Sequence, residues 1–146
     1  MYDQLSLYPV TNSKRLSLSL DGMWNFCFDP ESIGEKENWM SGLRSSVSLP
    51  VPSSFQDLFT DQYSKNYCGD FWYERDFFVP EHDGNIQLRF GSITHRGSVY
   101  VNGEKVAEHE GGFLPVLCDI AKYGRKGEVN HMSVKADNEL NERILP

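Results

Sequence analysis

Hydrophobic and polar residues alternate along several short segments of this chain. Trp24, Phe26 and Phe28 occupy every second position of the first such segment. A period of two residues is typical of a β-strand that buries one face. The same period recurs over residues 71–79, 86–90 and 132–136, and a proline-bounded extended segment spans 48–51. Turn residues separate the segments at short intervals, so the pattern predicts an antiparallel β-sandwich or barrel.

Two stretches depart from the alternation. Residues 35–43 favour a short helix that carries Trp39. Residues 53–69 form the longest segment without clear periodicity, which predicts a long surface excursion. Its aromatic residues, Phe59, Tyr63 and Tyr67 among them, would anchor it to the domain. Such a loop suits either a functional site or packing against a neighbouring domain.

The strongest local signal is the Asn102-Gly103 pair between two alternating runs. Asn-Gly favours a type I′ turn, because both central residues need a positive φ angle. A two-residue hairpin then places Val99 opposite Val106 and Tyr100 opposite Lys105. Extension of this register places His95 opposite Glu110 and Arg96 opposite His109.

Composition narrows the possible functions. The chain has 146 residues and a formal net charge of −7, which suits one globular domain and argues against nucleic-acid or anionic-membrane partners. No apolar stretch approaches the roughly 20 residues of a spanning helix, and the first residues do not resemble a signal peptide. Three widely spaced cysteines favour reduced thiols and a cytoplasmic location.

Catalytic and metal-binding motifs do not emerge from the residues. There is no nucleophile elbow, P-loop, dinucleotide fingerprint or zinc-protease motif. The predicted register places His95 and His109 on opposite faces of the hairpin, so structural roles are favoured over a metal site. No carboxylate pair shows the separation that glycoside hydrolysis needs. We therefore expect no catalytic residue, metal or cofactor in the chain.

Aromatic residues offer one further kind of site, a platform on which the C–H faces of a sugar could stack. Trp24 shares its face with Phe26 and Phe28, which favours the core. Trp72 shares its face with Glu74 and Asp76, which predicts an exposed or interfacial ring. Burial in a core or interface is the principal expectation for these rings, with a carbohydrate platform as the alternative.

Several segments resemble glycoside hydrolase family 2, and in part its β-glucuronidase branch. Their order and local spacing follow the family from about Leu20 to Pro146. They are Leu20-Asp-Gly-Met-Trp24-Asn-Phe26, Val51-Pro-Ser-Ser-Phe55-Gln-Asp57, Asn66-Tyr-Cys-Gly69-Asp-Phe-Trp72-Tyr73-Glu-Arg75, Val99-Tyr-Val-Asn102-Gly103, His109-Glu-Gly111-Gly112-Phe-Leu-Pro115 and Asp137-Asn-Glu-Leu-Asn141. Val116 departs from the pattern, since these enzymes often have an aromatic residue there.

The resemblance implies a single all-β domain over residues 1–146. Its fold would be a jelly-roll-type antiparallel β-sandwich, similar to galactose-binding domains, with one short helix. The immunoglobulin-like domain and the (β/α)₈ barrel of the family, with its two catalytic glutamates, would lie outside this chain. Trp72, Asp57 and Tyr67 become the candidate contacts to carbohydrate or to a neighbouring domain.

The implied function is that of an N-terminal carbohydrate-binding or scaffold domain in a retaining enzyme that hydrolyses β-D-glucuronides. The fragment alone would be inactive, and the whole enzyme would be a homo-oligomer. Cations that bind the glucuronide carboxylate would lie in the absent part, because this domain is negative. One alternative is a free-standing carbohydrate-binding module. Another is self-association through surfaces that missing neighbours would cover.

Overall fold

The computed structural model describes residues 17–52, 58–81, 85–90, 96–110 and 116–138. Strands dominate these ranges, and the two helices are each a single turn. The strands are β1 (Gly22–Asp29), β2 (Val47–Val51), β3 (Asp70–Val79), β4 (Gln87–Phe90), β5 (Arg96–Val101), β6 (Glu104–Glu110), β7 (Val116–Asp119) and β8 (Glu128–Asp137). The helices are the 3₁₀ turn η2 (Trp39–Ser41) and α2 (Gln62–Lys65).

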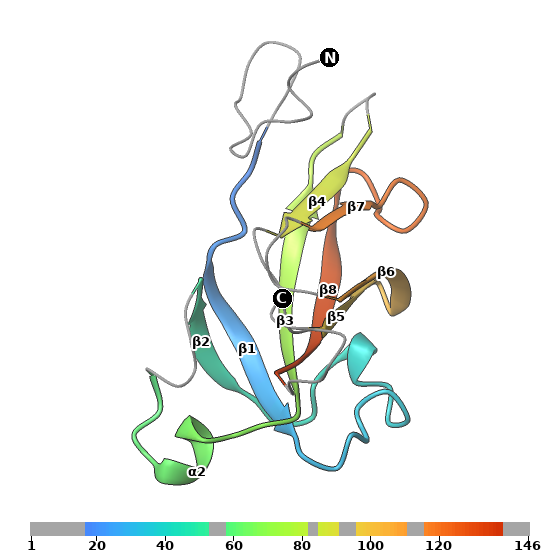
Figure 1. Ribbon diagram of the computed structural model, residues 1–146. Coiled ribbons are helices and arrows are strands. Elements are labelled where there is room, and N and C mark those ends of the chain that lie inside the picture. The colour runs from blue at the N-terminus through green and yellow to red at the C-terminus, as the bar shows by residue number, and fades with distance from the viewer. Residues whose placement is uncertain (1–16, 53–57, 82–84, 91–95, 111–115, 139–146) are drawn as a thin grey trace.

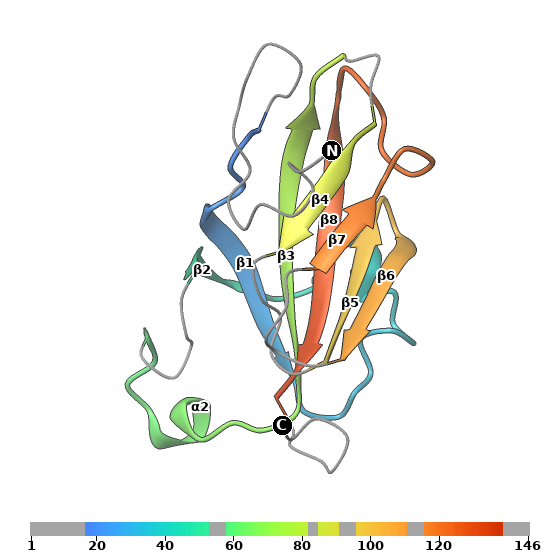
Figure 2. The same cartoon turned by 45° about the horizontal axis from the view of Figure 1, so that its top comes forward.

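The strands form two antiparallel sheets. Six of them make the larger sheet in the order β2-β1-β3-β8-β5-β6, and β4 pairs with β7 in the smaller one. Both views place β4 and β7 across the middle of the larger sheet (Figures 1 and 2). The strand β8 lies between β3 and β5, so the order is not that of a simple meander. The prediction of an all-β sandwich of the jelly-roll type is confirmed.

The inner face of the larger sheet, which the β4–β7 sheet covers, carries most of the core. Phe26 lies opposite Tyr73, Tyr73 opposite Val134, and Val134 opposite Val99, so one apolar row crosses four strands. Phe26 and Val99 are each 1% exposed. From the smaller sheet, Leu88 and Cys118 pack into the same cluster. The alternation seen in the sequence thus corresponds to one buried face per strand.

The outer face is covered at one end by residues 30–46, which cross from β1 to β2. A short helical stretch of one or two turns was expected over 35–43, and the structure has hydrogen-bonded turns there that end in the single 3₁₀ turn η2. Asn38 has a left-handed φ of 61°, which breaks the helix. The carboxylate of Asp29 accepts hydrogen bonds from the backbone N–H groups of Ile33 and Gly34, at 2.8 Å each, and fixes a series of turns instead.

The hairpin prediction is confirmed at the turn and wrong beyond it. Asn102 and Gly103 have φ angles of 52° and 86°, and Tyr100 lies opposite Lys105 as expected. A register shift after Val99 then places Val99 opposite Ala107 rather than Val106. A β-bulge adds one residue to one strand and moves every later pair. Consequently Arg96 lies opposite Glu110 and Gly97 opposite His109, while His95 lies outside the described residues.

Two elements were not anticipated. Strand β7 follows no clear alternation in the sequence, and α2 interrupts the stretch predicted as a surface excursion. Tyr67 is buried and Phe59 packs against the core, so both anchor this stretch as expected. Tyr63 is not an anchor in the same sense, because it is 63% exposed. No helix in the described ranges is long and apolar enough to cross a membrane.

Candidate functional site

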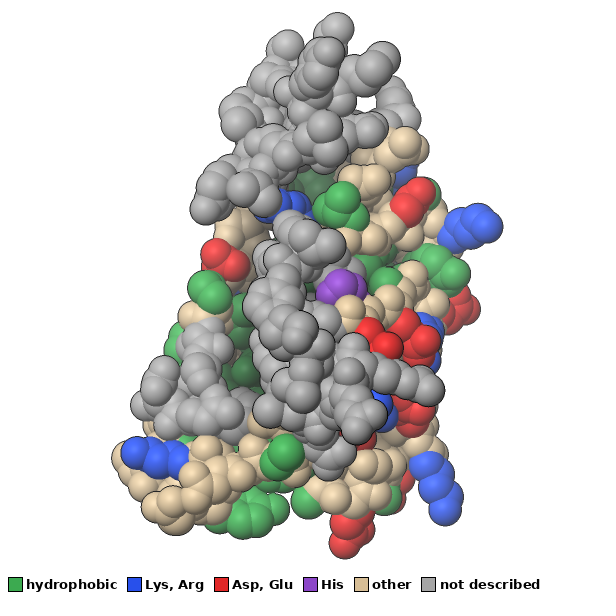
Figure 3. Space-filling view, in the orientation of Figure 1, with side chains coloured by type: hydrophobic (Ala, Val, Ile, Leu, Met, Phe, Trp, Pro, Cys, Tyr) green, Lys and Arg blue, Asp and Glu red, His purple; other side chains and the backbone are tan. Residues whose placement is uncertain are grey.

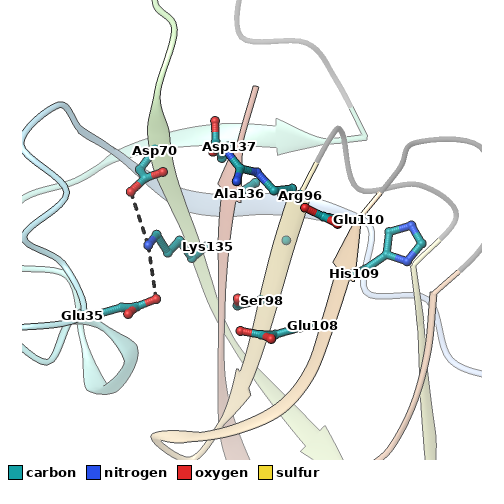
Figure 4. A pocket seen from close by; sticks show the side chains of 11 residues that line it. Glu35, Asp70, Arg96, Ser98, Glu108, His109, Glu110, Lys135, Ala136 and Asp137 are labelled. Carbon is teal, nitrogen blue, oxygen red and sulfur yellow. Dashed lines mark hydrogen bonds and ion pairs between the residues drawn. The ribbon is translucent and has the colours of Figure 1, made fainter. Parts of the chain in front are cut away.

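The outer face carries a hollow of about 470 Å³ at the end of the sheet where β8 ends and β5 begins, which we call the polar hollow (Figure 4). Its lining consists largely of charged side chains from four strands and from the crossover. The lining residues are Glu35, Asp70, Arg96, Gly97, Ser98, Glu108, His109, Glu110, Lys135, Ala136 and Asp137.

Strand register explains why these residues meet. Arg96 lies opposite both Asp137 on β8 and Glu110 on β6, and Ser98 lies opposite both Lys135 and Glu108. Directly opposite residues of an antiparallel pair share a face. Two rows of polar side chains therefore run across three strands, and residues 30–46 bring Glu35 to the same place (Figure 4).

Lys135 is the central cation of the polar hollow. Its ammonium group lies 3.2 Å from Glu35 Oε1 and 3.3 Å from Asp70 Oδ2. Burial disfavours the charged amine, but the hydrogen bond and charge of Glu35 and the charge of Asp70 outweigh it and raise the pKa of Lys135. Burial likewise opposes ionisation of Glu35, yet Lys135 holds the pKa of that carboxyl below its ordinary value. The pair is thus ionised at neutral pH.

Arg96 is the second cation, and it forms an ion pair with Asp137 at 2.5 Å. Its Nε atom is buried and has no hydrogen-bond partner among the described residues, as is also true of His109 Nε2. The cations of the polar hollow therefore already have carboxylate partners. Five carboxylates line it against two permanent cations, so an anionic ligand would meet net repulsion.

Glu35 does not have the electrostatics of a glycosidase general acid. A general acid needs a carboxyl group whose pKa is raised, whereas that of Glu35 is lowered. Within the described ranges, no group of three or more His, Cys, Asp or Glu residues is arranged to hold a metal ion. The arrangement fits a structural ion-pair network that ties the crossover to the sheet.

The structure contradicts the expectation that Trp72 is an exposed or interfacial ring and agrees with burial in a core. Its side chain is 0% exposed. The ring stacks on Tyr100 at 5.7 Å and meets Trp39 edge-on at 6.2 Å, and the indole N–H donates to Asp29 at 3.1 Å. Residues 30–46 cover this part of the outer face, which the strand pattern alone did not reveal. A fully buried ring cannot contact a sugar or a neighbouring domain.

The other two candidate contact residues do not join Trp72. Tyr67 is 7% exposed, and its hydroxyl donates to the backbone oxygen of Asp70 at 2.5 Å. Burial is the main cause that raises the pKa of this hydroxyl well above its ordinary value. Asp57 lies outside the described residues. The three residues are therefore not shown to form one site.

Tyr67 does line a second hollow, also of about 470 Å³, beside α2. We call it the tyrosine hollow. Its lining residues are Pro30, Gln62, Tyr63, Asn66, Tyr67 and Cys68. The two tyrosines of this hollow were predicted from the sequence as anchors, whereas Gln62 and Asn66 were not identified. Their spacing of four residues is that of one helical face, but so short a helix gave no periodic signal.

Comparison with known proteins identifies a family for this chain. The family model described as "Glycosyl hydrolases family 2, sugar binding domain" matches residues 17–141. Among curated relatives, the β-glucuronidase of Streptococcus agalactiae is 40% identical over 144 residues, which is 96% of this chain and 23% of the relative. That of Paenibacillus borealis is 36% identical over 143 residues, 96% of this chain and 24% of the relative.

A solved structure gives the same result in three dimensions. The β-glucuronidase of Ruminococcus gnavus, in one case in complex with D-glucuronic acid, matches with a TM-score of 0.92 and 57% identity over 95% of this chain. The match covers 24% of the Ruminococcus chain, so this chain spans about a quarter of these relatives. These comparisons support a module of a larger enzyme over a free-standing module. The chain belongs to the sugar-binding domain of glycosyl hydrolase family 2.

Proposed function

We propose that this chain is the N-terminal module of a β-glucuronidase whose catalytic domain lies in cis, outside these 146 residues. The observation that carries the proposal is the match to the Ruminococcus gnavus β-glucuronidase, at 57% identity and a TM-score of 0.92 over 95% of the chain. The similarity extends over nearly the whole domain and is not confined to one motif. The substrates of the whole protein would be β-D-glucuronides.

In this role the domain is a scaffold. Its outer face is fixed by the buried carboxylate of Asp29 and by the Lys135 ion pairs. A rigid module can hold a fixed position against a catalytic domain, which is what the precise geometry of an active site requires. The carboxylate of a glucuronide would be bound by cations of the catalytic domain, because the cations of the polar hollow are already paired.

A domain exchange tests this proposal. The matched quarter of the Ruminococcus gnavus enzyme is replaced by this chain, and hydrolysis of 4-nitrophenyl β-D-glucuronide is followed by absorbance. We expect the chimera to fold and to turn over this substrate, since the two modules share the fold and 57% of their residues over 95% of this chain. The unmodified enzyme, expressed in parallel, is the control. A folded chimera without activity would overturn the proposal.

A cytoplasmic location and a homo-oligomeric parent enzyme are part of the same proposal. Cys27, Cys68 and Cys118 are all free, which suits a reducing compartment. Burial raises the pKa of Cys27 and Cys118, so both thiols stay protonated and unreactive. Cell fractionation and light scattering of the whole enzyme test the two statements.

A further inference from the structure

One end of the outer face of the larger sheet is bare. Residues 30–46 cover the end that carries Trp72, whereas three apolar side chains at the other end face solvent. They are Met23 on β1, Phe78 on β3 and Val129 on β8, which are 59%, 56% and 64% exposed. Single exposed apolar side chains are ordinary on a domain, but these three share one face of three neighbouring strands. We call them the outer apolar patch.

Strand register makes the outer apolar patch continuous. Phe78 lies directly opposite Val129, and side chains in directly opposite positions of an antiparallel pair interact. On the other side of β3, Asn25 of β1 lies opposite Glu74. Continuation of that register by two residues places Met23 diagonal to Phe78 on the same face. The patch is therefore one surface that spans three strands.

The sequence of β3 at this end is that of a strand buried on both faces. Phe77, Phe78 and Val79 are three consecutive apolar residues, and such a run is typical of strands that are covered on both sides. The two inner side chains are buried, since Phe77 is 7% and Val79 is 3% exposed. Phe78 has no such cover within the described part of the chain, so the pattern indicates a cover from outside it.

A polar pair borders the patch and sets the chemistry of the surface that would cover it. Asp76 lies opposite His131, and its Oδ1 atom is 2.8 Å from Nδ1 of His131. The Asp76 side chain is still 68% exposed, so its carboxylate can accept further hydrogen bonds. Interfaces combine an apolar centre with a polar rim. The complementary surface would thus be apolar, with an N–H donor or a cation opposite Asp76.

The amount of protein outside this chain points to the occupant. This chain covers 24% of the Ruminococcus gnavus enzyme, so most of such a protein lies outside it. The described chain ends at Asn138, just after β8, while Val129 lies about 27 Å away at the start of that strand. A catalytic domain larger than this module is about 40 Å or more across, and therefore large enough to reach the patch from that end.

A second copy of this chain is disfavoured as the occupant. Each copy carries a formal net charge of −7, so two copies repel each other. A two-fold contact would bring the same surface of both copies together, including the exposed carboxylate of Asp76. Acidic side chains also gather over the β5–β6 side of the domain (Figure 3), which adds to the repulsion. A different surface, with its own charges, meets neither obstacle.

We propose that the outer apolar patch is the docking surface for the catalytic domain of the same polypeptide. The inference rests on the proposed function, which supplies that domain, and deepens it by assigning the face that the domain covers. Removal of Phe78 and Val129 from water would stabilise the contact, because burial of apolar surface is favourable. The crossover and the catalytic domain would then cover the two ends of one sheet face.

Thiol labelling tests the docking surface without reference to activity. Phe78→Cys and Val129→Cys are made separately in this chain and in the chimera with the Ruminococcus gnavus enzyme. Each protein is treated with a maleimide, and mass spectrometry of peptides separates the introduced thiol from the exposed Cys68. We expect rapid labelling in the chain alone and labelling at least about tenfold slower in the chimera, because a covered surface reacts only when it opens.

Leu117→Cys is the matched control, because Leu117 is similarly exposed (55%) but lies on β7 in the smaller sheet. It should be labelled at the same rate in both proteins. Equal rates for Phe78→Cys or Val129→Cys in the chain and the chimera would overturn the proposal, as would equal slowing of Leu117→Cys. Slow labelling in the chain alone would also overturn it, because a second copy or the chain itself would then cover the patch.

The two introduced thiols keep the test independent of any single variant and of the domain-exchange result. Val129→Cys is the smaller change, and it reports on the patch if Phe78→Cys fails to fold. Protected thiols in a folded but inactive chimera would support the docking surface and reject the β-glucuronidase assignment. Reactive thiols in an active chimera would reject the docking surface and leave the assignment intact.

Discussion

Replacement of Asp29 by asparagine should destabilise the domain far more than a surface change of the same kind. Asp29 is 1% exposed, and its carboxylate accepts three hydrogen bonds, from Ile33 N and Gly34 N at 2.8 Å and from Trp72 Nε1 at 3.1 Å. The Asp29→Asn side chain has the same shape but only one oxygen. In either orientation its NH₂ group must face at least one N–H donor.

The expected cost follows from these contacts. In the better orientation the oxygen keeps Gly34 and Trp72, and the amide faces Ile33. The loss of one hydrogen bond to a charged group, with its part-buried donor left unpaired, costs about 2–3 kcal/mol of the free energy of unfolding. That is a large part of the roughly 5–15 kcal/mol by which domains are stable. For a domain of this size it lowers the Tm by about 5–10 °C.

The assay is urea and thermal unfolding of the purified chain, followed by tryptophan fluorescence. Asp21→Asn is the matched control, because it makes the same chemical change at an exposed position and should stay within about 0.5 kcal/mol of the original. If the two variants lose the same small amount, the carboxylate does not hold the crossover and the reasoning is refuted.

Two further changes test the outer face. Gly34→Ala places a Cβ atom 2.5 Å from Trp72 Nε1, and this overpacking should lower the free energy of unfolding by about 2 kcal/mol or more. Gly42→Ala is the control, because its Cβ atom meets nothing within 4 Å and should leave the free energy of unfolding nearly unchanged in the same assay. Glu35→Gln should destabilise by less than about 1 kcal/mol, because Glu35 is half-exposed. Because the pKa of Glu35 is lowered in the folded chain, the stabilisation by the Glu35–Lys135 ion pair is lost as the pH falls below about 4.3. Because the pKa of Lys135 is raised, the same stabilisation is also lost well above about pH 10.4. A deficit in Glu35→Gln that grows at low pH would contradict this account.

The strand content could be read from the sequence because burial on one face imposes a period of two. Phe26, Phe77 and Met132 are buried as that period requires. The Asn102-Gly103 turn could also be predicted from the sequence, since few residues other than these adopt positive φ at low cost. The bulge after Val99 could not be predicted, because the hydrophobic period is the same on either side of it and only the cross-strand pairing reveals the shift.

The candidate site was predicted less well, for a physical reason. Trp72 shares its strand face with polar residues, and the side chains that bury it come from the crossover and from Tyr100 on β5, both distant in the sequence. Alternation along a strand reports which side chains share a face, but not what covers that face. Lys135 and Glu35 are likewise 100 positions apart, so their ion pair depends on the topology.

The most direct test of the central claim, that this domain supports catalysis and performs none, is chromophore release from 4-nitrophenyl β-D-glucuronide by the purified 146-residue chain. We predict a rate equal to that of buffer, because catalysis is assigned to a separate domain. Release that rises in proportion to the concentration of the chain, and persists through repeated purification, would contradict the account.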